Sequence, residues 1–215
     1  AQLKNTKILE LDDTTRRSQA GEYQSTRIVE LFLAFTSRAI DIDIKEKVAE
    51  EFIKIGLTEA TSSDDFLPLF IKALELMTEF DLQLDRIKQG KEITSRIRNG
   101  KDIFTSSTAS IGFVVAIAEL TLGAPGFSYD IEQAKKKITV IEKTIKTLVK
   151  FTGGLSDSEL LEFVDLETLN QVLSIKSGKI GDYERSLYKK AFITLLTRSK
   201  EIRNEGTMTP CWMSR

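Results

Sequence analysis

Apolar residues recur with a helical period along most of the chain. Two long segments, from Ser63 to Asn99 and from Ile131 to Leu148, repeat them at steps of three and four, which is the spacing of one packed helix face. The apolar positions are Phe66, Phe70, Leu74, Met77, Phe80, Leu84 and Ile87 in the first segment and Ile131, Ala134, Ile138, Ile141, Ile145 and Leu148 in the second. The pattern predicts two long amphipathic helices.

Shorter segments with the same period surround these two. We expect helices over residues 23–40, 41–55, 156–177 and 182–204, with Ser128 as the cap of the second long helix. No segment alternates between apolar and polar residues for long enough to predict a strand. The sequence therefore predicts an all-α protein. Its parts are a polar N-terminal arm (1–20), a single helical domain (21–205) and an irregular C-terminal tail (206–215).

The segment between the two long helices has a different pattern. From Ala109 to Leu122 it is apolar on every side except at Glu119, and it closes on the turn Gly123-Ala124-Pro125-Gly126. A helix without a polar face is buried by neighbouring helices in water or is surrounded by lipid. We therefore expect an elongated bundle of long antiparallel amphipathic helices around an apolar central helix.

Composition narrows the chemistry that the chain can perform. There is no histidine, which removes the commonest general base and metal ligand, and the single cysteine, Cys211, cannot form an internal disulfide. No phosphate-binding glycine loop or EF-hand spacing occurs, and acidic pairs such as Asp64-Asp65 are typical of solvated helix surfaces. We expect no enzyme activity, no cofactor and no metal.

Charge is balanced overall but uneven along the chain. The formal net charge is −1, so there is no general basic footprint for nucleic acid, and we expect no nucleic-acid partner. Lysines 135–137, 143, 146 and 150 nevertheless gather on the second long helix, interleaved with Glu132 and Glu142. This cluster is either a solvated helix face or a surface that attracts the phosphate groups of lipid or nucleic acid.

The central segment resembles a known membrane-active element. Small residues at 106–110 and at Gly112, an apolar run, and the 123–126 turn before an amphipathic helix resemble the hydrophobic hairpin region of apolipoprotein-L-like proteins and α-helical pore-forming toxins. In those families the segment lies between long helices and inserts into membrane. Here the arm after the turn, from Tyr129 onward, is polar at once. The resemblance therefore implies shallow insertion at the membrane interface.

Two hypotheses of function follow. In the first, the apolar segment 109–127 is shielded in the soluble state and then docks on lipid or inserts into it. The lipid-facing residues are Ile111, Phe113, Val114, Val115, Ile117, Leu120 and Leu122, and the hinge is formed by Gly123, Pro125 and Gly126. In the second, the chain is a structural, viral or regulatory helical protein that self-associates or binds a helical partner through its heptads.

The N-terminal residues bear on the cellular location of the protein. It lacks the apolar core of a secretory signal. We expect a cytoplasmic protein, or one secreted without a visible signal, and membrane association under the first hypothesis.

Overall fold

The computed structural model describes residues 9–11, 21–41, 63–89, 103–126, 128–151, 172, 175 and 181–197. These residues form five long helices, a 3₁₀-helix and two short strands. The helices are α1 (Ser25–Ser37), α3 (Ser63–Gln89), α4 (Ser107–Leu122), α5 (Ile131–Phe151), α8 (Asp182–Thr197) and the 3₁₀-helix η2 (Ile103–Thr105). The all-α class expected from the sequence is confirmed. The expected helix over 42–55, most of that over 156–177 and the tail 206–215 lie outside the described residues.

A short parallel pair of strands at the N-terminal side was not expected. Strand β1 (Leu9–Leu11) pairs with β2 (Glu22–Gln24), so that α1 begins at Ser25 and not at Tyr23. The Tyr23 hydroxyl donates a hydrogen bond of 3.2 Å to a carboxylate oxygen of Asp81 on α3, which also accepts one of 3.0 Å from the Gly21 N–H. Tyr23 and Asp81 are both buried. These contacts with α3 hold the segment before α1 in place. No local sequence pattern predicts them.

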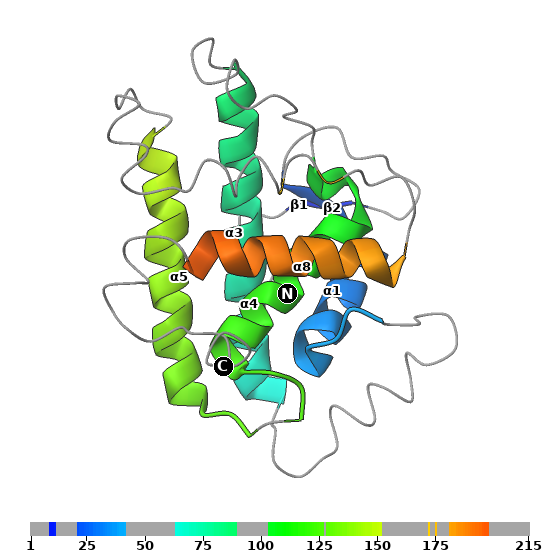
Figure 1. Cartoon of the computed structure of the whole chain (residues 1–215), viewed down its shortest axis with the longest axis vertical. Coiled ribbons are helices and arrows are strands. Elements are labelled where there is room, and N and C mark those ends of the chain that lie inside the picture. Colours follow the sequence, from blue (N-terminus) through cyan, green and yellow to red (C-terminus); the bar gives the residue numbers. More distant parts are fainter. Residues whose placement is uncertain are drawn as a thin grey trace.

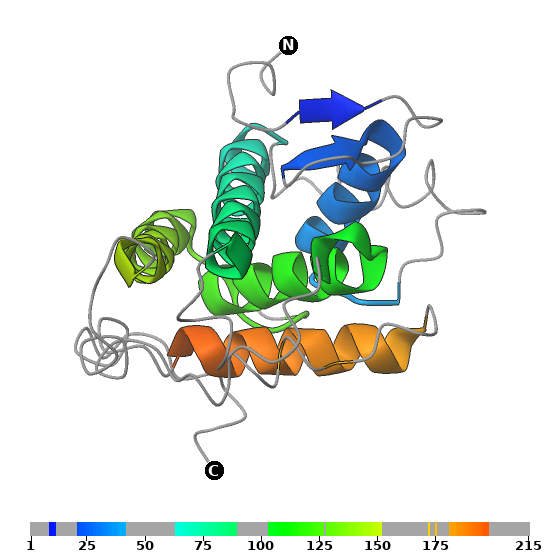
Figure 2. The same cartoon turned by 90° about the horizontal axis from the view of Figure 1, so that it is seen from above.

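Helix α4 occupies the middle of the described helices. Figure 2 shows α8 on one side of α4 and the pair α1 and α3 on the other, with α5 at the edge. In Figure 1, α3 and α5 stand side by side, and α8 crosses in front of α3 and ends beside α5. Helix α4 contacts all four of these helices and η2. Within the described residues, α4 is therefore in contact with helices on several sides.

The two long helices run in the same direction, whereas the sequence led us to expect antiparallel pairing. Phe66 near the start of α3 packs against Tyr129, just before α5, with ring centroids 5.2 Å apart. Further along both helices, the Lys72 ammonium lies 2.9 Å from the Glu142 carboxylate. Because α4 connects α3 to α5, the chain crosses the molecule before α5 begins. A short loop favours antiparallel neighbours, and this crossover removes that constraint.

The periodic faces of the long helices are buried, as their spacing predicted. On α3 the buried positions include Phe66, Phe70, Leu74, Met77 and Phe80, and on α5 they include Ala134, Ile138, Ile141 and Ile145. The side chains of Leu84, Ile87 and Leu148 lie outside the described residues. Both faces belong to one continuous hydrophobic core.

The start of α5 differs in detail from the expectation. Asp130, and not Ser128, caps the helix, because its carboxylate accepts hydrogen bonds from the N–H groups of Glu132 (2.8 Å) and Gln133 (3.2 Å).

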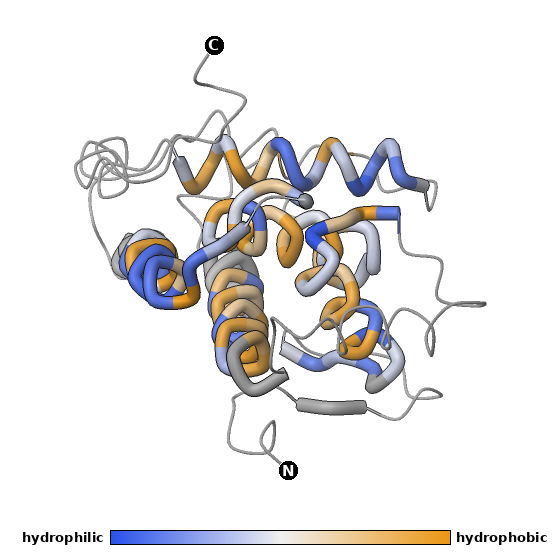
Figure 3. Tube along the Cα trace, turned by 90° about the horizontal axis from the view of Figure 1, so that it is seen from below, coloured by the Kyte–Doolittle hydropathy of each residue, from blue (hydrophilic) through white to orange (hydrophobic). Residues whose placement is uncertain are grey.

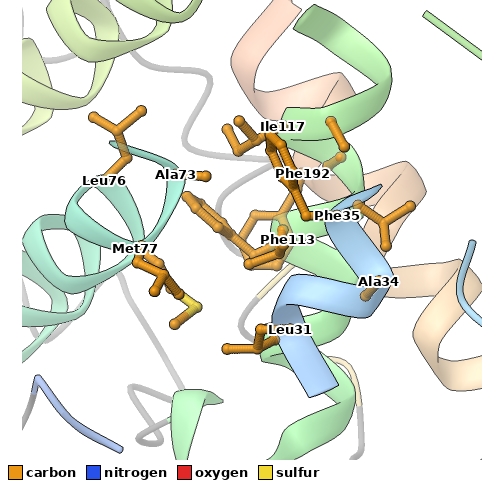
Figure 4. Close-up of a cluster of buried hydrophobic side chains, with 14 of the residues drawn as sticks. Leu31, Ala34, Phe35, Ala73, Leu76, Met77, Phe113, Ile117 and Phe192 are labelled. Carbon is orange, nitrogen blue, oxygen red and sulfur yellow. The ribbon is translucent and has the colours of Figure 1, made fainter. Parts of the chain in front are cut away.

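Aromatic rings join four elements at the centre of this core. The Phe113 ring of α4 lies 4.9 Å from that of Phe192 on α8, 5.5 Å from Phe104 in η2 and 5.9 Å from Phe80 on α3. Such ring pairs stabilise a core beyond the area that they bury. Figure 4 shows Phe113 and Phe192 together with Leu31 and Phe35 of α1. The centre of α4 is therefore packed against α1, α3, α8 and η2.

Candidate functional site

The predicted lipid-facing residues all lie inside the protein. Ile111, Phe113, Val114, Val115, Ile117, Leu120 and Leu122 are each at most 6% exposed. Of the 16 residues of α4, 14 are buried, so no side of this helix faces water along its length. The segment is thus shielded in this structure, and the candidate site consists of α4 and the contacts that hold it.

Two hydroxyl groups of α4 make their hydrogen bonds to carbonyls of the preceding turn. The Thr121 hydroxyl donates to the Ile117 carbonyl at 2.7 Å, and the Ser110 hydroxyl donates to the Ser106 carbonyl at 3.1 Å. This bonding to the preceding turn is common for Ser and Thr in apolar surroundings. These two polar groups therefore stay satisfied in any environment that keeps α4 helical.

Helix α8 approaches the backbone of α4 closely at Gly112. A methyl group built at Gly112 lies only 2.5 Å from Cβ of Tyr188, 3.0 Å from the Lys189 nitrogen and 3.1 Å from the Arg185 carbonyl oxygen. Gly112 therefore has a steric reason to be glycine, because a side chain would push the two helices apart. Among the described helices, α8 has the most extensive contact with α4.

The acidic residue of α4 is paired across this same contact. A carboxylate oxygen of Glu119 lies 2.6 Å from the Lys189 ammonium of α8, and both side chains are largely shielded, at 15% and 21% exposure. A carboxylate in this position needs a partner, because burial of an unpaired charge is costly. The ion pair joins the two helices and compensates the charge on an otherwise apolar segment.

The C-terminal end of α4 is held by Arg38. This residue ends α1 in the left-handed region, at φ 55°, and its guanidinium donates hydrogen bonds to the carbonyls of Leu122 (3.4 Å), Gly123 (3.4 Å) and Ala124 (2.9 Å). A cation at a helix C-terminus also interacts favourably with the helix dipole. The guanidinium carbon lies 5.6 Å from the Tyr129 ring centroid, within cation–π range.

Burial affects the pKa of this guanidinium but not its charge. It lowers the pKa of Arg38, and the nearby Tyr129 and Glu119 act in the opposite direction. Arginine stays protonated at any physiological pH. The bonds from Arg38 to the end of α4 are therefore insensitive to ordinary changes of pH.

The other end of α4 has its own capping group. Ser106 precedes the helix and its hydroxyl oxygen accepts a hydrogen bond of 3.2 Å from the Thr108 N–H. Arg27 of α1 donates to the carbonyl of Thr105 at 3.0 Å. Since Arg27 lies in the first turn of α1 and Arg38 is its C-cap, α1 runs alongside α4 in the same direction and contacts both of its ends.

The predicted hinge has the backbone that its glycines suggest. Gly123 and Gly126 have φ values of 86° and 83°, a region that disfavours other residues, and Pro125 and Gly126 are exposed. No atom lies within 4 Å of a methyl group built at either glycine. The glycines are therefore required by backbone conformation and not by packing.

Helix α8 is also attached to α1. Arg185 donates to the Ile40 carbonyl at 2.8 Å and lies 3.3 Å from the Glu30 carboxylate. Burial raises the pKa of Glu30, and the charges of Arg185 and Arg27 counter this effect in part. Helix α8 thus contacts the rest of the molecule through a charged group in its first turn as well as through the apolar core.

The sequence did not identify the residues that hold α4. Arg27, Arg38 and Lys189 are basic residues without any distinguishing local motif, and each acts on a residue at least 70 positions away. Gly112 did carry a signal, since a glycine inside an apolar helix often marks a close helix contact. The predicted lipid-facing positions and the hinge are brought together on one helix and its exit turn.

Within the described residues, no group of three or more metal-ligating side chains is present, and no helix has both the length and the apolar character needed to cross a membrane. No family model, curated protein or solved structure matches the chain.

Proposed function

We propose that this chain is a non-enzymatic, membrane-active helical protein in which α4 is shielded until it docks on lipid or inserts into it. The observation that carries the proposal is the burial of an all-round apolar helix by four separate helices. Apolar burial stabilises by about 25 cal/mol per Å² whether the surroundings are protein or lipid. Exchange of one environment for the other is therefore close to balanced for most of the α4 surface.

The length of α4 favours a position at the membrane interface. At about 1.5 Å per residue, its 16 residues extend for roughly 24 Å, which is shorter than the hydrocarbon core of about 30 Å. Glu119 adds a reason for a shallow position, because a charged carboxylate at the bilayer centre costs about 2.5–3.5 kcal/mol. We propose that the helix lies in the interface with Glu119 near the headgroups.

Release of α4 requires that α8 moves away. The Glu119–Lys189 ion pair and the Gly112–Tyr188 contact both belong to the α4–α8 interface. The exit turn at Gly123 and Gly126 supplies the backbone freedom for the end of α4 to swing. Separation of these two helices is the structural step on which this function depends.

The geometry is less favourable to a partner that binds through the heptads. The described heptad positions of α3 and α5 are buried within the chain itself, apart from the half-buried Ile131, so they offer no free apolar seam. A partner helix would have to displace one of the chain's own helices. For this reason we prefer the membrane-active proposal over a heptad-binding protein.

A reversible cross-link between α4 and α8 tests the proposal. Cys211 is first replaced by Ser, and Glu119→Cys and Lys189→Cys are joined by a short bis-maleimide reagent with a cleavable disulfide in its spacer. The replaced side chains are in contact at 2.6 Å, so a short spacer spans the pair. We expect the linked protein to release no dye from vesicles, and cleavage of the spacer to restore release.

A matched pair on other helices controls for the chemistry. Lys72→Cys and Glu142→Cys replace an ion pair of 2.9 Å between α3 and α5, and the same link there should leave dye release intact. Equal release by the linked and cleaved α4–α8 protein would show that α4 is not the active segment. Absence of both flotation and dye release with neutral and anionic vesicles after cleavage, at pH 7 and pH 5, would overturn the membrane proposal.

A further inference from the structure

Arg38 joins three parts of the chain at the point where α4 ends. It is the C-terminal cap of α1, its guanidinium donates hydrogen bonds to the carbonyls of residues 122–124, and it lies over the ring of Tyr129, just before α5. The last carbonyls of a helix have no partner within the helix itself. Arg38 therefore supplies donors to these carbonyls where α4 leaves the core.

The backbone of Arg38 adopts a conformation that disfavours side chains. Its φ of 55° makes it the only non-glycine residue with a positive φ in the part of the chain that the structure describes. Glycine is the usual residue at such a left-handed helix end. Backbone strain of this kind is often kept where a side chain has a function. At Arg38 this side chain is the one that bonds to the end of α4.

The two ends of α4 differ in how closely the protein surrounds them. At the start, two of the three residues of η2 are buried, and Gly112 is packed against the backbone of α8. At the other end, Pro125 and Gly126 are exposed, and no atom lies within 4 Å of a methyl group built at Gly123. Local opening of α4 therefore has room at the exit turn, where Arg38 bonds to the backbone.

We propose that Arg38 is an autoinhibitory latch: its hydrogen bonds keep the end of α4 closed, and their loss starts the release of α4. The inference rests on the proposed function and names the contact that regulates it. Glu119 lies one turn before the exit turn, and its main-chain carbonyl accepts a hydrogen bond of 3.0 Å from the Gly123 N–H. Opening of this last turn shifts Glu119 relative to Lys189 and so weakens the ion pair between α4 and α8.

Hydrogen exchange followed by NMR tests the latch without any lipid. Arg38→Gly removes the guanidinium and suits the left-handed backbone, so the loss of the side chain adds no strain. We expect exchange of the Gly123 N–H to become about tenfold faster, because hydrogen bonds from a charged group are stronger than neutral ones. Exchange of the Ser110 N–H, which bonds to the Ser106 carbonyl at the start of α4, should change by less than about twofold.

A control variant separates a latch from a general loss of stability. Val140→Ala on α5 removes buried methyl groups and lowers the free energy of unfolding, but it leaves the contacts of Arg38 intact. Figure 3 shows α5 at the edge of the described helices. Arg38→Gly should release dye from vesicles about tenfold faster than the unmodified protein, in proportion to the open fraction. Val140→Ala should change the rate by less than about twofold.

The outcomes separate the latch from the function on which it rests. Unchanged exchange at Gly123, or equal acceleration at Gly123 and along α5, would overturn the latch, because Arg38 would then be dispensable or would support the whole fold. Faster exchange at Gly123 without faster dye release, or equally fast release by Arg38→Gly and Val140→Ala, would also overturn it and leave the membrane function standing.

Failure of the membrane function has a different signature. In that case neither the unmodified protein nor Arg38→Gly floats with neutral or anionic vesicles or releases dye from them. The exchange rate of the Gly123 N–H would still decide whether Arg38 closes the end of α4.

Discussion

Helices α4 and α5 follow each other in the chain but meet opposite surroundings. Helix α4 has apolar residues on every side and is buried on every side, whereas α5 has one apolar face in the core and one basic face in water. In α4 the hydroxyls of Ser110 and Thr121 bond to the preceding turn and Glu119 pairs with Lys189 of α8. In α5 the ion pairs of Lys135 with Glu132 and of Lys146 with Glu142 join residues of the same helix near its surface. The comparison teaches that the apolar pattern around a helix determines how many neighbours it needs.

The same comparison indicates which contacts would have to break for α4 to leave the protein under the proposed function. Helix α5 is already in a suitable environment on both faces, so moving it away from the core would expose its buried apolar residues. Under the proposed function the apolar surface of α4 exchanges protein for lipid, and the contacts at Gly112, Glu119 and the C-terminal end hold it in the protein. A transition therefore depends on those contacts and not on the apolar surface itself.

A new carboxylate at matched positions tests the comparison with the largest expected effect. Val115 of α4 is fully buried and Thr139 of α5 is exposed. Val115→Asp should lower the free energy of unfolding by about 3–5 kcal/mol, because the charge is left buried without a partner. Thr139→Asp should change it by less than about 0.5 kcal/mol. Chemical denaturation followed by circular dichroism measures both, and similar losses would refute the contrast between the helices.

A single methyl group tests the contact between α4 and α8. Gly112→Ala raises helix propensity, but the added methyl group meets Tyr188 and two backbone atoms of α8 at 2.5–3.1 Å. We expect a net loss of about 1–3 kcal/mol in the free energy of unfolding. Thr139→Ala on α5 raises helix propensity without such a clash and should be neutral or slightly stabilising. Thermal unfolding compares the two, and a stabilised Gly112→Ala protein would contradict the close contact.

Two carboxylates provide the smallest and most specific test, because their pKa values shift in opposite directions. Burial raises the pKa of Glu30 above 4.5, with Arg185 and Arg27 in part opposing it. For Glu142, burial alone raises the pKa, but hydrogen bonds and charge from Lys146 and Lys72 outweigh it and the pKa is lowered. The Glu30 contribution to stability is present below 4.5 and is lost as the pH rises through its folded pKa. The Glu142 contribution is present above 4.5 and is lost as the pH falls through its folded pKa.

The corresponding amides should reveal these opposite signs. Relative to the unmodified protein, Glu30→Gln should become more stable as the pH rises from acidic to neutral, whereas Glu142→Gln should become less stable. Urea denaturation across this pH range measures both trends. Parallel trends for the two variants would mean that the environments at the α1–α8 contact and on α5 do not differ as described. Because acidification favours the folded state at Glu30, acid does not release α8 through this residue.

Within the described residues, the sequence by itself predicted the helices and which of their faces are apolar. The period of Ile138, Ile141 and Ile145 was sufficient to predict a buried face, and the unbroken apolar run around Val115 was sufficient to predict burial on all sides. Both follow from the geometry of a single helix, in which residues three and four apart share a face. The turn after α4 was also visible in the sequence, because Gly123 and Gly126 adopt a backbone conformation that favours glycine.

The tertiary structure alone decided how these helices meet. The parallel direction of α3 and α5, the strand at Tyr23 that bonds to Asp81, and the contacts of Arg38 and Lys189 with α4 all join residues far apart in the chain. Local propensity carries no information about such partners, since any of the 31 lysines and arginines has the same local chemistry. Only the packing of α1 and α8 around α4 selects the few basic residues that hold the apolar helix in place.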